Sequence, residues 1–181
     1  MSGRWWWTVL PVLGWQVTAS VCFYSVLAST QFVHATFDVS NFLVGLLIAG
    51  LMVGYTAALF PMGAVVDAYG EKPVMAAGLV GLGLSALGVY EAPGFQSLAA
   101  AVVVLGVVYA VAMPSTNIAI VNGVAPARRN VAMGIKQVGV TAGAGTGALL
   151  VTAFAATRYG WRTGFLVAGG LAGVVLLGFL A

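Results

Sequence analysis

The sequence has very little charge. Only 6% of its 181 residues are Asp, Glu, Lys or Arg, whereas 61% are hydrophobic and the mean hydropathy is +1.06. A soluble domain carries about 25% charged residues, because water must solvate its surface. So few charges exclude a soluble globular fold and predict that lipid surrounds most of the chain. The net charge of +3 is therefore no sign of nucleic-acid binding.

The side chains that carry most enzymatic and metal chemistry are also scarce. A single cysteine, Cys22, excludes an internal disulfide and a cysteine-based metal site, and we interpret it as a small apolar filler. The one histidine, His34, is expected in a loop at a membrane edge, where it could not act as the base for a nucleophile deeper in the membrane. The sequence therefore predicts no cofactor, no metal site and no enzymatic activity.

Long neutral stretches separate the few charges. A bilayer core of about 30 Å needs roughly 20 helical residues, and six stretches approach or exceed that length. These stretches are continuously apolar and do not alternate between two faces, so they predict helices rather than the strands of a barrel. We expect one all-α integral membrane domain over 1–181, a six-transmembrane-helix bundle. Its expected spans are 7–31, 41–66, 74–90, 95–122, 131–156 and 161–181.

The connectors between these spans differ in positive charge. With six spans, both termini share one side of the membrane with four basic residues: Arg4, Lys72, Arg128 and Arg129. The opposite side holds only two, Arg158 and Arg162. Cytoplasmic connectors carry an excess of Lys and Arg. We therefore expect both termini in the cytoplasm, and the membrane is expected to be a prokaryotic plasma membrane.

The turn after the second span carries the most specific motif. Residues 63–72 read Gly-Ala-Val-Val-Asp-Ala-Tyr-Gly-Glu-Lys, and they resemble the Gly-x-x-x-Asp-Arg-x-Gly-Arg-Lys loop signature of the major facilitator superfamily. Four positions match the signature: Gly63, Asp67, Gly70 and Lys72. Its two arginine positions hold other residues, Ala68 and Glu71.

Physical chemistry explains why these residue types would stand at the matching positions. Gly63 would let another helix approach the second span closely, and Gly70 would allow a tight turn with positive φ. Asp67 would accept hydrogen bonds from a helix N-terminus, for which the start of the fifth span is the natural candidate. The resemblance implies that this loop, with Lys72, helps to hold one side of a transporter closed.

Two shorter motifs extend the resemblance. The connector 126–129, Pro-Ala-Arg-Arg, is similar to the basic connector of the family, and 160–162, Gly-Trp-Arg, resembles the entry to its sixth helix. The fifth span also has glycines at four-residue spacing, which lets helix backbones touch; these are Gly139, Gly143 and Gly147. The resemblance implies half of a twelve-helix transporter that moves a small solute by alternating access between two six-helix halves.

Polar residues inside apolar spans are candidates for a substrate cavity, because they need a polar partner or water there. Gln16, Ser20 and Tyr24 are four residues apart and share one helical face. The resemblance implies that the first and fourth spans line the cavity; the alternative is that this face only joins helices. In the fourth span, Pro114 should free the carbonyl near position 110, and Asn117 is the expected cavity residue. This span has no charge, so the family's arginine there has no counterpart, which argues against proton coupling through this half.

The fifth span carries the adjacent pair Lys136 and Gln137. Lys136 lies seven residues past Arg129, about 10 Å deeper if the helix starts there. Its ammonium either extends back to the membrane edge or points into the cavity, where it would attract an anionic group. No carboxylate is expected at mid-membrane in this chain. The second alternative predicts an organic or inorganic anion as the substrate.

Two other interpretations remain open. A channel or an oligomeric scaffold could be built from six helices, although no filter sequence or ring-forming charge pattern is present.

The sequence is still apolar where it stops at Ala181, which favours a fragment. The expected partners are thus the lipid bilayer, a small-molecule substrate, and a missing C-terminal half or a second copy.

Overall fold

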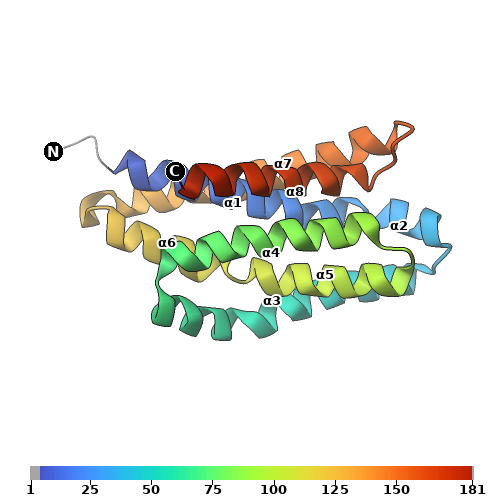
Figure 1. The fold of residues 1–181 in the computed structure, drawn as a ribbon, viewed down its shortest axis with the longest axis horizontal. Helices are drawn as coiled ribbons and strands as arrows, with labels where there is room; N and C mark the ends of the chain where they lie inside the picture. Colours follow the sequence, from blue (N-terminus) through green and yellow to red (C-terminus); the bar gives the residue numbers. More distant parts are fainter. Residues whose placement is uncertain (1–4, 181) are drawn as a thin grey trace.

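Six membrane-length helical segments run side by side in one bundle (Figure 1). The computed structural model describes residues 5–180. The segments are α1 (Trp6–Ala28), α3 (Asn41–Tyr69), α4 (Glu71–Glu91), the pair α5 (Phe95–Tyr109) and α6 (Ala112–Gly123), α7 (Arg129–Ala155) and α8 (Thr163–Leu180). Two short helices, α2 (Thr30–Phe37) and η1 (Pro126–Arg128), complete the described chain. The predicted all-α fold with six membrane-spanning segments is confirmed.

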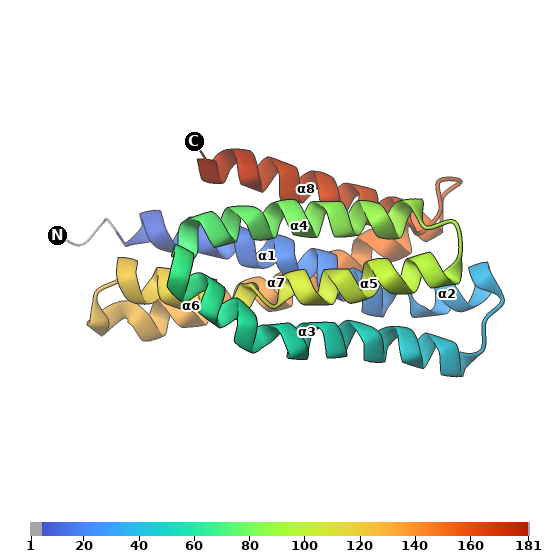
Figure 2. The same cartoon turned by 60° about the horizontal axis from the view of Figure 1, so that its bottom comes forward.

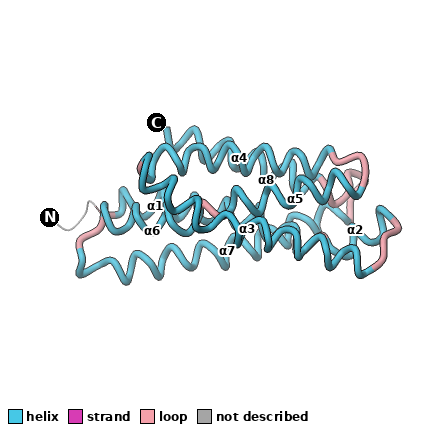
Figure 3. Tube along the Cα trace, turned by 90° about the horizontal axis from the view of Figure 1, so that it is seen from below, coloured by secondary structure: helices cyan, strands magenta, loops and turns pink. Residues whose placement is uncertain are grey.

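The turns lie mainly at the two ends of the bundle (Figure 3). The start of α1, the turn at Gly70, η1 and the end of α8 share one end, here called the terminal end (Figure 2). Lys72, Arg128 and Arg129 lie there, whereas Arg158 and Arg162 lie at the opposite end. Arg4, the fourth basic residue expected beside the termini, lies outside the described residues.

The first span does not end where the sequence suggested. α1 stops at Ala28, and after a break at Ser29 the helical path continues as α2 to Phe37. Asp38 then adopts a left-handed conformation with φ 50°, which ends α2. Ser40 caps the next helix, because its Oγ accepts a hydrogen bond from the Leu43 amide at 3.3 Å.

The fourth span is interrupted close to position 110, where the sequence predicts that Pro114 frees a carbonyl. α5 ends at Tyr109 and α6 begins at Ala112, so the break lies four residues before the proline. Proline has no N–H to give to the carbonyl of Ala110, and its ring crowds that turn. The break lies where α5–α6 runs beside α1 and α3, so it shapes the interior of the bundle.

The glycines of α7 let it pack directly on α1. The close contact with a helix was predicted, whereas the partner helix was not. A Cβ at Gly143 would lie 2.5 Å from the Val17 carbonyl oxygen and 2.6 Å from the Ser20 Cβ. A Cβ at Gly147 would lie 2.8 Å from the Val21 carbonyl oxygen. These distances are too short for any side chain, so only glycine permits this contact.

The family-like motifs of the connectors hold helix ends. Arg129 donates from Nε to the Val124 carbonyl at 3.0 Å and from Nη2 to the Val121 carbonyl at 2.8 Å. These bonds give hydrogen-bond partners to carbonyl groups at the C-terminus of α6. At the opposite end, Trp161 donates from Nε1 to Thr36 Oγ1 at 3.0 Å. The α7–α8 turn is thereby fixed to α2.

Candidate functional site

An open cavity of about 270 Å³ lies between α1, α3, α7 and the break that separates α5 from α6. Four of the six predicted cavity residues line it: Gln16, Tyr24, Lys136 and Gln137. The other lining residues are Phe23, Met52, Tyr55, Tyr109, Ala112, Met113 and Val140. The cavity therefore has polar walls from α1 and α7, and an aromatic and thioether wall from α1, α3, α5 and α6.

Lys136 faces this cavity rather than the membrane edge. Its side chain is 7% exposed, and its Nζ donates to Asn117 Oδ1 at 2.6 Å. Of the two orientations that the sequence left open, the structure places the ammonium inside the bundle. Asn117 does not line the cavity itself. Its Oδ1 accepts the hydrogen bond of the ammonium group and so helps to fix the position of Lys136.

No carboxylate of the described residues balances this charge. All four acidic residues lie at helix ends: Asp38, Asp67, Glu71 and Glu91. The one neutral partner, Asn117, contributes a hydrogen bond but no negative charge. A buried cation without a counter-ion is costly in a membrane protein.

The polar face of α1 divides between two roles. Ser20 is fully buried where α1 meets α7, and its Oγ lies 3.4 Å from the Tyr109 hydroxyl. Gln16 lines the cavity and also donates to Ser20 Oγ at 3.4 Å. Tyr24 lines the cavity and is half-buried. Ser20 thus joins helices, as the alternative interpretation held, whereas Gln16 and Tyr24 face the cavity.

An aromatic cluster in the same cavity was not predicted from the sequence. The rings of Phe23 and Tyr109 stack with centroids 4.2 Å apart, and Tyr55 lies 5.6 Å from Tyr109 and 5.9 Å from Phe23. These residues come from α1, α3 and α5. In the sequence, Tyr55 and Tyr109 could be recognised only by a polar hydroxyl inside an apolar span. We used that signal for Tyr24 but not for Tyr55 and Tyr109.

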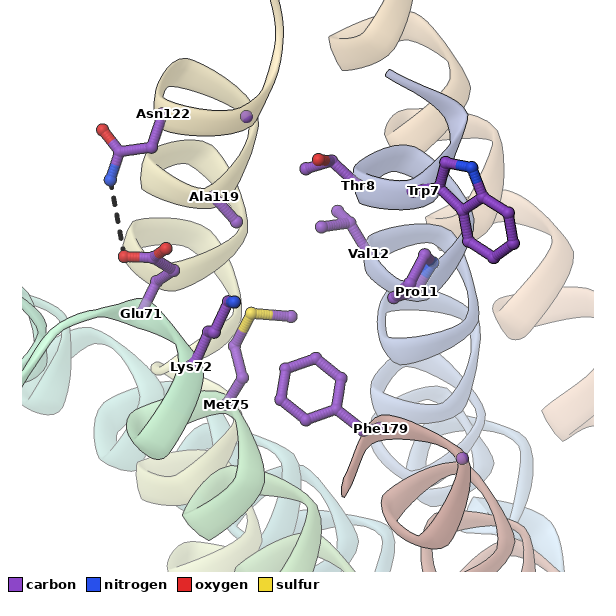
Figure 4. Close-up of a pocket in the computed structure, with 12 residues that line it drawn as sticks. Trp7, Thr8, Pro11, Val12, Glu71, Lys72, Met75, Ala119, Asn122 and Phe179 are labelled. Atoms are coloured by element: carbon purple, nitrogen blue, oxygen red, sulfur yellow. Dashed lines mark hydrogen bonds between the residues drawn. The ribbon is translucent and has the colours of Figure 1, made fainter. Parts of the chain in front are cut away.

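The loop motif borders a second cavity of about 430 Å³ at the terminal end (Figure 4). Gly70 has φ 82°, which confirms the predicted positive-φ turn. Lys72 and Glu71 follow it and line the cavity together with Met75, Phe179 and part of α1. Glu71, which stands at an arginine position of the signature, accepts a hydrogen bond from Asn122 Nδ2 at 3.4 Å.

Two expectations for this motif are not met within the described residues. A Cβ at Gly63 would meet nothing within 4 Å, so no helix of the described chain packs closely there. Asp67 is exposed in the last turn of α3, and no hydrogen bond joins it to the start of α7 in the part of the chain that the structure describes. The reason is topological, because α7 packs mainly on α1 and leaves the end of α3 uncovered.

Comparisons with known proteins identify a family and a fold. The profile of the Major Facilitator Superfamily matches residues 9–181. Two crystal structures of a bacterial homolog to the human lysosomal transporter Spinster, both inward-facing, one occupied and one unoccupied, superpose with a TM-score of 0.87. They are 19% identical to this chain and cover 99% of it, while the chain covers 44% and 43% of theirs. None of the curated proteins matched.

A profile match over almost the whole chain decides the family, and the solved structures show the fold. The chain spans less than half the length of those solved transporters, in agreement with six helices out of twelve. This integral membrane chain therefore belongs to the major facilitator superfamily of transporters, which are not enzymes.

Proposed function

We propose that this chain forms one half of a secondary active transporter that moves a small anion by alternating access. The observation that carries the proposal is Lys136, a cation in the cavity with a neutral amide as its partner. A bound anion would supply the missing negative charge, and the low dielectric around it would strengthen the attraction. Gln16 and Gln137, which also line the cavity, add amide N–H donors.

A second six-helix body completes the transporter in this proposal. The cavity is open, and exposed apolar side chains of α3 and α7, such as Phe60, Val138 and Leu149, leave surface for a partner. Alternating access needs two bodies that rock about a shared site, which one bundle cannot do alone. The second body is a C-terminal half or a second copy of this chain.

The terminal end faces the cytoplasm in this proposal, and the membrane is a prokaryotic plasma membrane. Lys72, Arg128 and Arg129 at that end support this orientation against Arg158 and Arg162 at the other. Basic residues close to membrane spans are retained on the cytoplasmic side. Asp67 and Gly70 would then lie on the cytoplasmic side, where the loop motif acts as a conformational gate.

Uptake measurements with purified protein in liposomes test the anion proposal. We expect saturable uptake of a labelled small anion such as benzoate, with competition from other anions. Benzamide, its neutral counterpart, should compete at least tenfold more weakly, because it cannot neutralise Lys136. Flux that rises linearly with concentration would indicate a channel instead. Equal competition by benzamide and benzoate would contradict the proposed anion selectivity.

A further inference from the structure

We infer that the substrate is an amphipathic organic monoanion, with its charged group at Lys136 and an aromatic or similarly flat body among Phe23, Tyr55 and Tyr109. This inference rests on the proposed function and names the substrate class of the same site. Three observations carry it: the separation of the charged and aromatic walls, the geometry of the aromatic cluster, and a single cation among the described residues that line the cavity.

The charged and aromatic parts of the cavity lie at different depths. Lys136 is seven residues into α7, about 10 Å from the terminal end at 1.5 Å per residue. Asn117 lies six residues before the end of α6, at a similar depth of about 9 Å. Tyr55 lies fourteen residues before the end of α3, and Tyr109 lies fourteen residues before the end of α6, so each is about 21 Å along its own helical path. A ligand that touches both parts is therefore elongated along the bundle axis.

The aromatic part of the cavity suits a flat apolar body. Phe23 and Tyr109 stack at 4.2 Å, and Tyr55 approaches both rings at an angle. Because the Tyr109 hydroxyl is 3.4 Å from Ser20 Oγ, its polar tip turns away to α1 while its ring borders the cavity. Aromatic rings favour stacked or edge contacts with another ring. Met52 and Met113 add flexible thioethers that adapt to such a surface.

A small inorganic anion fits this cavity less well. Phosphate and sulfate sites use arginine forks, several cations or helix N-termini, and the described lining residues include one cation and no arginine. A single ammonium neutralises one negative charge. An inorganic ion at Lys136 would also leave the aromatic wall without contact, so binding would gain nothing from its apolar surface.

Binding measurements with four probes separate these possibilities. Purified protein in lipid nanodiscs would be titrated calorimetrically with 2-naphthoate, acetate, nitrate and the neutral 2-naphthalenemethanol. We expect 2-naphthoate to bind at least tenfold more tightly than each of the other three. Tyr55→Leu should weaken 2-naphthoate about fivefold and leave acetate unchanged, since only the ring contact is lost. Tyr69→Leu, the same change at an exposed site on α3, should alter neither.

Each other outcome overturns a defined part of the account. If nitrate or acetate binds as tightly as 2-naphthoate and Lys136→Gln weakens all of them, the amphipathic class with an aromatic body is wrong while the anion function stands. If Tyr55→Leu weakens acetate as much as 2-naphthoate, the aromatic subsite is wrong. If 2-naphthoate and 2-naphthalenemethanol bind equally and Lys136→Gln changes neither, the proposed anion function itself fails. Absence of binding by all four probes to folded protein overturns both.

Discussion

Gly143→Val should abolish the stable fold of this bundle. The nearest atoms to a Cβ at this position are the Val17 carbonyl oxygen and the Ser20 Cβ, at 2.5 and 2.6 Å, so α1 and α7 would have to separate. Neither atom belongs to the far end of a flexible side chain, so local adjustment cannot relieve the overlap. We expect a loss of about 3 kcal/mol or more in the free energy of unfolding, beyond the usual cost of overpacking.

Gly145→Val is the matched control for this prediction. Gly145 lies on the same helix two residues later, and a Cβ there would meet nothing within 4 Å. The change should stay within about 0.5 kcal/mol, as at other uncrowded surface sites. Thermal unfolding in detergent, followed by size-exclusion chromatography, measures both variants. If Gly143→Val and Gly145→Val unfold at the same temperature, the close α1–α7 contact is not the one described.

Lys136→Gln should reduce anion transport about 100-fold in kcat/KM. Loss of one partner from a desolvated charged contact costs about 3 kcal/mol, which is about two factors of ten. The glutamine keeps a hydrogen-bond donor for Asn117 but removes the only cation among the described cavity residues. Uptake of labelled benzoate into liposomes, measured over a range of concentrations, gives the ratio.

A stability measurement separates this effect from simple misfolding. A buried ammonium without a counter-ion opposes folding, so Lys136→Gln should leave the unfolding temperature unchanged or raise it. Arg158→Gln removes one positive charge from the exposed far end and should change neither transport nor stability. If Lys136→Gln lowers stability and transport together, the lysine supports the structure and its role as the anion site is not supported. Unchanged benzoate transport in Lys136→Gln would also contradict that role.

Sequence alone predicted those features that depend on local chemistry. The break before Pro114 follows from a missing N–H, and the turn at Gly70 follows from the freedom of glycine at positive φ. The close approach of α7 to another helix follows from glycines at four-residue spacing. Spacing did not identify α1 as the partner helix, because that choice depends on how all six helices pack.

The site required contacts between distant parts of the chain. Lys136 could extend to the membrane edge or into the bundle, and the position of Asn117, nineteen residues earlier, decides between them. Tyr55 and Tyr109 are 54 positions apart and meet only because α3 packs on α5. Helical spacing within one segment cannot reveal such neighbours. It identified Gln16, Ser20 and Tyr24 as one face but could not tell which of them join helices.

For the loop motif, the match to a family pattern did not predict the contacts that its residues make. Its residues matched a family pattern, yet Gly63 and Asp67 make no contact of the expected kind within the described residues. The expected partners were a closely packed helix for Gly63 and the start of the fifth span for Asp67, and the described residues show neither contact.

The most direct test of the anion site is to locate a bound anion. A structure of the protein with 4-iodobenzoate would show the iodine by its strong scattering. The account predicts the carboxylate within hydrogen-bonding distance of Lys136 Nζ and the iodine on the side of Tyr55 and Tyr109. An iodobenzoate found only elsewhere, for example beside Lys72 in the cavity at the terminal end, would contradict it.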